Sequence, residues 1–266
     1  MSVSSSPIPA AAAAVVARLR AAGCVFAEDE ARLLLSSAHT AAELETMVGR
    51  RVAGEPLEHV VGWADFCGLR VAVGPGVFVP RPRTEFLVQQ AAALAREVAG
   101  TPVVLDMCCG TGALGLALAA RLGRAELHAA DLDPAAVRCA RRNLPAGRVH
   151  EGDLYEPLPA SLRGRVDILI ASPPYVPSRS IGLLPPEARL HEPLLALDGG
   201  GDGLDVVRRV IAGAPEWLAP GGHLLVETGE RQAEAAVLAV AEAGLAGRAA
   251  VSDERDATAV IGTRIL

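Results

Sequence analysis

The sequence predicts an α/β protein, with a mostly parallel β-sheet covered by helices on both faces and a small helical segment before it. Three observations support this prediction. From about residue 82, strand-like runs alternate with helical patterns, which is typical of parallel sheets. Residues 9–50 carry apolar residues at helical spacing and show no strand pattern. The last two predicted strands have no helix between them, which indicates an antiparallel pair at the edge of the sheet.

Composition narrows the class of protein. The 266 residues allow one α/β domain with a small appendage, and 51% of them are hydrophobic but only 3% aromatic. No run approaches the roughly 20 apolar residues that span a bilayer, and no basic segment precedes the Ala-rich start. We therefore expect a cytoplasmic protein without a membrane partner. The net charge of −6 argues against a nucleic-acid partner, and five cysteines without metal-ligand spacing predict reduced thiols and no metal site.

Changes in composition and hydrophobic pattern along the chain predict three segments. Residues 1–53 read as a helical domain. Residues 54–81 read as a connector of one or two β-hairpins, because glycines interrupt short alternating apolar runs. Residues 82–266 form the main α/β domain. Its predicted helices cover residues 84–98, 112–122, 134–143, 203–218 and 230–243, and its predicted strands cover residues 103–106, 125–131, 148–152, 166–171, 222–228, 247–252 and 258–265.

A glycine-rich turn joins the first of these strands to the next helix, in "VVLDMCCGTGALGLALAARL". Gly110, Gly112 and Gly115 match the G-x-G-x-x-G pattern of dinucleotide sites, so an NAD-dependent dehydrogenase is one alternative. Asp106 ends the strand and puts a carboxylate where a cationic ligand group can sit, although a turn or cap acid has the same appearance.

Acidic residues also end the next two strands. Asp131 is placed to accept hydrogen bonds from two ribose hydroxyls, while Asp133, followed by Pro134, is expected to cap a helix. Asp153 can bind an adenine amino group, with Leu154 against the ring. The carboxyl ends of parallel strands meet at one edge of a sheet. Together with Asp106, these acids favour a ligand with a positive centre and a nucleoside, and S-adenosylmethionine fits that description.

The fourth strand ends in two prolines, within "DILIASPPYVP". Pro173 and Pro174 have no N–H group and a nearly fixed φ, so the turn presents acceptor oxygens beyond the strand. Ser172 adds a hydroxyl, and Tyr175 can pack across a bound planar group. Acceptors beside an aromatic wall suit a planar –NH2 group, whose nitrogen must be positioned to attack a methyl group. A proline-rich turn that merely leaves the sheet is the structural alternative.

From about Gly54 to its C-terminus, the chain resembles the HemK/PrmC-type protein-(glutamine-N(5)) methyltransferases. The matching motifs include "GEPLEHVVG", "VPRPRTE", "DMCCGTGALGLALA", "ADLDPAAVRCARRN", "GDLYEPL", "SPPY", "ALDGGGDGLD" and "LAPGGHLLVETGERQ". The resemblance implies a Rossmann-like class I methyltransferase with a seven-stranded sheet, which uses S-adenosylmethionine and leaves S-adenosylhomocysteine. It implies that the cofactor is bound by Asp106, Cys108, Gly110, Gly112, Asp131, Leu132, Asp153, Leu154 and Ser172, and that the acceptor amide is held and activated by Ser172, Pro173, Pro174 and Tyr175.

The family's acceptor is the glutamine in the Gly-Gly-Gln loop of peptide-chain release factors, or a ribosomal-protein glutamine in a sister group. The resemblance therefore implies a protein partner, recognised with help from the N-terminal helical domain. Three residues depart from the family pattern. Ser172 replaces Asn, Cys108 replaces a Gly of the cofactor loop, and Arg83 replaces an acid in the "PRPxTE" motif.

Other functions remain open at this stage. Amino-methylating DNA methyltransferases also use a Ser-Pro-Pro-Tyr turn, for the exocyclic amine of cytosine. Another planar amine or amide is a further possible acceptor, and a non-catalytic binding module is the alternative outside enzymes. Glu227 is expected to be a satisfied acid at the end of a strand. The histidines are expected to be structural, namely His59, His128, His150, His191 and His223.

Overall fold

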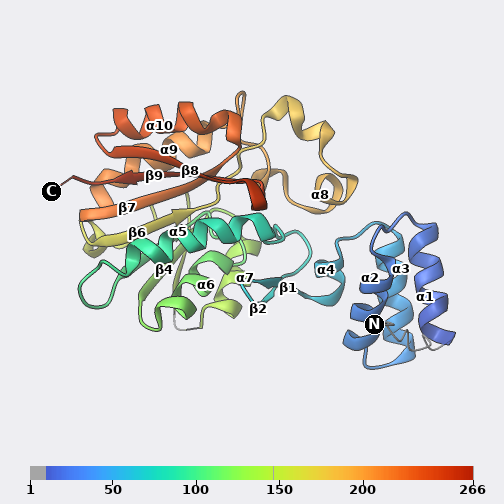
Figure 1. Cartoon of the computed structure of the whole chain (residues 1–266). Helices are drawn as coiled ribbons and strands as arrows, with labels where there is room; N and C mark the ends of the chain where they lie inside the picture. Colours follow the sequence, from blue (N-terminus) through green and yellow to red (C-terminus); the bar gives the residue numbers. More distant parts are fainter. Residues whose placement is uncertain (1–9, 146, 266) are drawn as a thin grey trace, which may run out of the picture.

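The computed structural model describes residues 10–145 and 147–265. Residues 1–9 of the predicted N-terminal domain, and residues 146 and 266 of the predicted main domain, lie outside the described residues. Figure 1 shows a group of N-terminal helices set apart from a larger α/β body, with helix α8 (Pro186–His191) between the two.

The N-terminal group has its own small core. It consists of α1 (Ala10–Ala21), α2 (Ala27–Ser37), α3 (Ala41–Val52) and α4 (Leu57–Val61). Leu19, Leu34 and Val48 are fully buried at its centre, and Val60 of α4 belongs to the same hydrophobic cluster. The cluster therefore extends beyond residue 53, and we propose that the N-terminal unit ends near Gly62 rather than at the predicted boundary.

The connector contains one hairpin and one helix. Strands β1 (Trp63–Phe66) and β2 (Leu69–Ala72) pair antiparallel, as expected. Helix α4 was not predicted, because five residues are too short to show a helical period. Pro56 precedes it, and Gly62 ends it with a φ of 84°, a conformation that glycine adopts without strain.

Seven strands form the main sheet, in the order β5-β4-β3-β6-β7-β9-β8. The first five in that order are parallel, and β9 pairs antiparallel with both β7 and β8. This topology confirms the predicted fold, including its antiparallel edge. The bounds are β3 (Val103–Met107), β4 (Glu126–Asp131), β5 (Arg148–Glu151), β6 (Val166–Ala171), β7 (Leu218–Thr228), β8 (Ala246–Ser252) and β9 (Ala257–Thr263).

Helices cover both faces of this sheet (Figure 1). Because successive strand residues point to opposite faces, Val104 packs with α5 (Glu85–Ala95) and α6 (Ala113–Leu122), whereas Leu105 packs with the opposite layer. That opposite layer is formed by α9 (Asp205–Trp217) and α10 (Ala233–Glu242), and α7 (Pro134–Asn143) lies beside α6. Within the described residues, no helix combines the length and apolar character that crossing a bilayer requires.

One guanidinium joins the N-terminal helices to α8. Arg51 Nε lies 2.7 Å from Glu30 Oε2 of α2, and Arg51 Nη1 lies 3.0 Å from Glu187 Oε2 of α8. Both acids raise the pKa of Arg51, with the hydrogen bond to Glu30 as the largest cause. Arg51 also donates from Nη1 to the Glu55 carbonyl, so this one side chain ties α2, the connector and α8 together.

Replacing Arg51 by methionine should lower the free energy of unfolding by about 3 kcal/mol, because it leaves the nearly buried Glu30 without its cation. Urea unfolding followed by circular dichroism measures the change. The control is Arg32→Met on α2, whose exposed pair with Asp29 should contribute no more than about 0.5 kcal/mol. Equal losses in the two variants would contradict the proposed role of Arg51.

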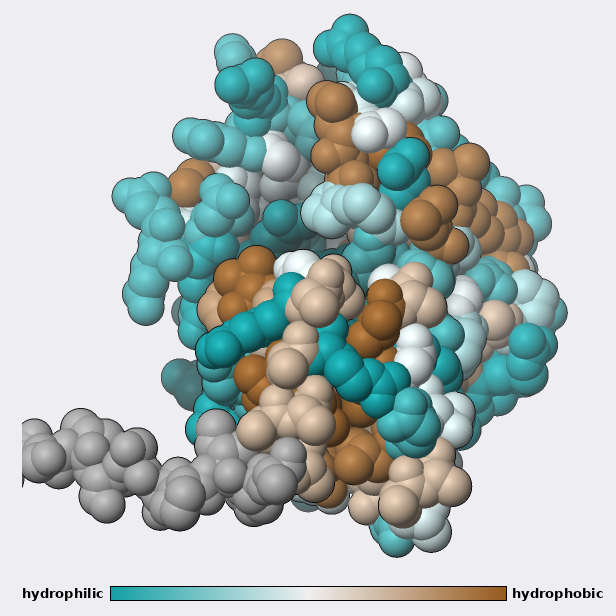
Figure 2. Space-filling model, turned by 90° about the vertical axis from the view of Figure 1, so that its right-hand side faces the viewer, coloured by the Kyte–Doolittle hydropathy of each residue, from teal (hydrophilic) through white to brown (hydrophobic). Residues whose placement is uncertain are grey.

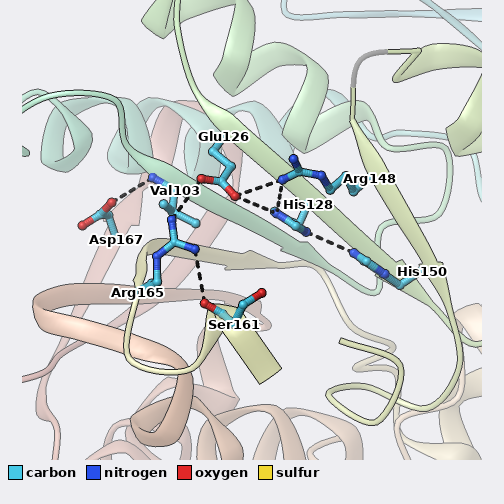
Figure 3. A network of polar contacts seen from close by, with 8 residues as sticks. All are labelled: Val103, Glu126, His128, Arg148, His150, Ser161, Arg165 and Asp167. Atoms are coloured by element: carbon cyan, nitrogen blue, oxygen red, sulfur yellow. Dashed lines mark hydrogen bonds and ion pairs between the residues drawn. The ribbon is translucent and has the colours of Figure 1, made fainter. Parts of the chain in front are cut away.

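His128 of β4 and His150 of β5 form a polar network on adjacent strands (Figure 3). His128 Nδ1 and His150 Nε2 are 3.0 Å apart, and the two rings stack. Glu126 accepts hydrogen bonds from Arg148 and Arg165 beside them. Burial lowers the pKa of both histidines, so they are neutral at pH 7 and pack against each other without charge repulsion.

Candidate active site

The glycine-rich turn lies at the carboxyl end of β3 and opens α6. Gly110 has a φ of 54°, and its N–H donates to Asp131 Oδ2 at 2.7 Å, which ties the turn to the end of β4. Gly112 has a φ of 76°, and a Cβ atom there would lie 2.8 Å from Leu144 Cδ1. Gly110 therefore contributes to the turn through its backbone, and Gly112 allows close packing against Leu144.

Two residues beside this turn have a positive φ although they are not glycine. Cys108 has a φ of 55° and Leu154 a φ of 49°, and both line the same cavity. Such conformations concentrate at functional sites, where the surrounding structure compensates for the strain. The geometry also explains why glycine suits position 108, and it shows that Cys108 adopts the left-handed conformation instead of rearranging the turn.

Asp106 lies beneath the turn, not in the cavity wall. Its side chain is fully buried, and Oδ2 accepts from the Gly115 N–H at 2.8 Å. The other oxygen, Oδ1, has no hydrogen-bond partner in the described structure. Burial raises the pKa of Asp106 to about 8. This placement differs from the expectation of a direct ligand contact, and we propose that Asp106 supports the turn from behind.

The raised pKa of Asp106 predicts a specific pH dependence. Between about pH 4 and pH 8 the folded protein retains a proton that the unfolded chain has lost, so stability should fall as the pH rises. Asp106→Asn cannot ionise at this position. Between pH 5 and 7, we expect the slope of its free energy of unfolding against pH to be shallower than that of the unsubstituted protein, and the two slopes to differ by up to about 1 kcal/mol per pH unit. Urea unfolding at three pH values tests this, and parallel curves for the two proteins would contradict it.

A first cavity lies at the carboxyl ends of β3, β4 and β6. Its wall includes the acids Asp131 and Asp153. Asp131 accepts from the N–H groups of Gly110 and Asp133, and burial raises its pKa despite these bonds. Asp153 pairs with Arg209 at 2.7 Å. Leu132 is 49% exposed, so its apolar surface is available to a flat ring.

A second cavity lies on the other side of the double-proline turn. It is lined by Pro173 and Tyr175, by Pro56 of the connector and by Pro185 near α8. Ser172 lines both cavities, whereas Pro174 lines only the first. The turn thus separates two hollows, with Ser172 at their junction. The view from the side of the N-terminal helices shows the surface hollowed behind them, with apolar groups among hydrophilic ones (Figure 2).

The glycine-rich segment 198–203 holds the back of this turn. Val176 forms an isolated parallel bridge with Asp198. A Cβ atom on Gly199 would lie 2.7 Å from the Pro174 carbonyl oxygen. Gln232 Nε2 donates to the Tyr175 carbonyl at 2.9 Å, so that oxygen is already occupied. The turn is therefore rigid, and Ser172 is the residue of this turn that lines both cavities.

A buried carboxylate, that of Glu227, accepts hydrogen bonds from Ser172 and two other side chains. Glu227, at the end of β7, is 3% exposed. Its Oε2 accepts from Ser172 Oγ at 2.7 Å and from Thr84 Oγ1 at 2.8 Å, and its Oε1 accepts from the Tyr175 hydroxyl at 3.2 Å. Arg83 Nε lies 3.6 Å from the same Oε1. Glu227 is satisfied, as expected, but its partners belong to the site.

The structure brings most of the predicted site residues together. The first cavity includes Cys108, Gly110, Asp131, Leu132, Asp153, Leu154, Ser172 and Pro174, and the second adds Pro173 and Tyr175. Asp106 and Gly112 support the turn without lining either cavity. Sequence reasoning missed Arg209 and the group around Glu227. In the described part of the chain, no cluster of His, Cys, Asp or Glu has the arrangement of a metal site.

Comparisons with known proteins identify the chain's relatives. The family model for the methyltransferase small domain matches residues 69–183. A release factor glutamine methyltransferase of Geobacter sulfurreducens is 39% identical over 223 residues, covering 82% of this chain and 76% of that protein. Another, from Cereibacter sphaeroides, is 38% identical over 257 residues, covering 88% and 89%.

The chain belongs to the release factor glutamine methyltransferase family. This membership confirms the predicted family, the enzyme class and S-adenosylmethionine as the methyl donor. The fold of this chain is similar to that of a methyltransferase from Pyrococcus furiosus, with a TM-score of 0.55 and 17% identity, covering 75% of this chain and 90% of that one.

One relative within the same range of similarity carries a different name. A 4-amino-L-phenylalanine/4-methylamino-L-phenylalanine methyltransferase of Streptomyces pristinaespiralis is 41% identical over 193 residues, covering 70% of this chain and 65% of that protein. Relatives of this chain at this level of identity therefore include a protein named for an aromatic amine.

Proposed function

We propose that this protein methylates the side-chain amide nitrogen of a glutamine in a peptide-chain release factor. The observation that carries the proposal is the position of Ser172, at the junction of the two cavities. A methyl donor in the first cavity and an acceptor in the second would meet at this residue. The relatives named as release factor glutamine methyltransferases support this choice of acceptor.

The residues of the first cavity fit the methyl donor. The Asp131 carboxylate suits two ribose hydroxyls, and the exposed Leu132 suits an adenine ring. Asp153 also lies in this wall, where Arg209 fixes its carboxylate. Bound S-adenosylmethionine supplies an electrophilic methyl group on a sulfonium centre.

The double-proline turn positions the acceptor nitrogen. An amide nitrogen is a weak nucleophile because its lone pair is delocalised. Ser172 Oγ accepts a hydrogen bond from the –NH2 group, and Tyr175 contributes an aromatic wall. Methyl transfer would form the nitrogen–methyl bond, leave the donor as a neutral thioether and release one amide proton to water. Positioning of this kind can contribute roughly 7 kcal/mol to lowering the barrier.

The second cavity also suggests where the protein partner contacts the enzyme. It extends from Pro56 in the connector to Pro185 and Ala188. Leu183 and Leu190, on the neighbouring segment that contains α8, are 85% and 68% exposed. We propose that the N-terminal helices and this segment together recognise the protein substrate.

A primary aromatic amine of a free amino acid is a second candidate acceptor. It is favoured by Ser172, whose side chain is shorter than the family's Asn and leaves more room, and by the relative named for 4-amino-L-phenylalanine. Such an amine presents the same planar –NH2 group to the turn, so the chemistry of the site does not change.

Transfer of a tritiated methyl group separates these acceptors. The substrates are a release factor, its Gln-to-Ala variant in the Gly-Gly-Gln loop, 4-amino-L-phenylalanine and cytosine-containing DNA. We expect incorporation into the release factor alone, and its loss in the Gln-to-Ala variant. Incorporation into the amino acid alone would favour the second candidate, and incorporation into DNA would overturn both.

A further inference from the structure

We infer that Glu227 is a positioning residue, which holds the Ser172 hydroxyl so that its lone pairs, and not its proton, face the acceptor nitrogen. The inference rests on the proposed function for the identity of that acceptor. Glu227 lines neither the first nor the second cavity, but a third hollow behind Tyr175. It therefore acts through Ser172 rather than by touching the reacting atoms.

The donor and acceptor inventory fixes the direction of the hydrogen bond. A serine hydroxyl has one proton and two lone pairs, whereas an ionised carboxylate can only accept. Because Ser172 Oγ lies 2.7 Å from Glu227 Oε2, the serine proton is directed at the carboxylate. The remaining lone pairs of Ser172 are free for a group that donates, which matches an –NH2 acceptor and disfavours an acceptor that offers only lone pairs.

The Glu227 carboxylate is surrounded by side chains that donate to it. Three hydroxyl groups donate to it, from Thr84, Ser172 and Tyr175, and a buried carboxylate needs such partners. Arg83 adds a cation at 3.6 Å, and its guanidinium lies 5.9 Å from the centre of the Tyr175 ring. The family pattern has an acid at position 83, which would repel Glu227 here. The departures at Ser172 and Arg83 are therefore linked through one carboxylate.

The test is a double-mutant cycle on turnover with the release factor. Ser172→Ala should lower kcat about 100-fold and Glu227→Gln about 20-fold, because the glutamine amide can turn the serine proton toward the acceptor. If Glu227 acts through Ser172, the double variant should stay within about threefold of Ser172→Ala. A loss of about 2,000-fold, the product of the single effects, would overturn the inference.

A control variant and a stability measurement complete the test. Glu85→Gln is the matched control, since Glu85 pairs with Arg255 and lines none of the cavities, and it should change kcat less than about twofold. The double-mutant cycle of Ser172→Ala and Glu227→Gln can also be measured on the urea midpoint of unfolding, which needs no acceptor. The shift in the double variant should be smaller than the sum of the shifts in the two single variants. Shifts in the urea midpoint that simply add would overturn the inference, even if the release factor proved not to be the acceptor. A wild-type protein that does not methylate the release factor would overturn only the proposed function.

Discussion

Alanine at position 172 should lower kcat for release-factor methylation about 100-fold, while the Kd of S-adenosylmethionine stays within about twofold. The change removes the hydroxyl at the junction of the two cavities, and with it the acceptor that orients the amide nitrogen. The other residues of the first cavity, including Asp131 and Leu132, are unchanged in this variant and can still bind the methyl donor. Single-turnover kinetics and calorimetry measure the two quantities separately.

Ser178→Ala is the matched control for this variant. Ser178 lies on the same loop and is exposed, and its hydroxyl donates to Asp198 outside the cavities. Its kcat should change no more than about twofold. If Ser172→Ala weakened donor binding as much as turnover, its hydroxyl would belong to the donor site instead of the acceptor site.

Replacing Asp131 by alanine should have the reverse effect and raise the Kd of S-adenosylmethionine about 100-fold. Hydrogen bonds to a charged group contribute about 1.5–3 kcal/mol each, and the carboxylate is placed to accept two from the ribose. The loss should be larger for binding than for kcat at saturating donor. Calorimetry with S-adenosylmethionine and with S-adenosylhomocysteine measures it.

Asp131 also ties the glycine-rich turn to β4 through the Gly110 N–H, so the variant needs a control for local disorder. Asp131→Asn keeps an oxygen for that N–H, but it loses the charge and puts an amide nitrogen in place of the oxygen that accepts from the Asp133 N–H. We expect its Kd to rise about tenfold. A Kd for Asp131→Asn equal to that of the alanine variant would show that binding needs the full carboxylate, and an unchanged Kd in both would remove Asp131 from the donor site.

Much of the fold could be predicted because its strands and helices have clear periods. The parallel strands are continuous apolar runs, and helix α7 begins with Asp133, whose side chain accepts from Ala135 N, and Pro134 at the first position. Helix α8 was missed, because six residues carry no period. Its only signal was the pair Pro185-Pro186, which suits a first helical turn but also suits a loop.

The site was predictable where chemistry follows directly from a strand end. Asp131 ends β4, while Asp153 and Ser172 follow closely after β5 and β6, and the meeting of such residues at one edge of parallel strands is a rule of topology. Asp106 follows the same rule, yet its side chain turns under α6, and spacing alone does not reveal the direction of a side chain. Glu227 bonds to Ser172, which is 55 positions away in the sequence, and to Thr84, which is 143 positions away. This network therefore emerges only from tertiary packing.

The contacts of Arg51 have a consequence for how the molecule can be divided. Leucine and valine side chains give the N-terminal helices their own interior, and the sheet has another. A shortened chain starting at Gly54 would keep every wall of the first cavity, but Glu187 would lose its counterion and α8 its anchor. We therefore expect binding of S-adenosylmethionine and binding of the protein substrate to be separable properties, with Arg51 linking α8 to the N-terminal helices.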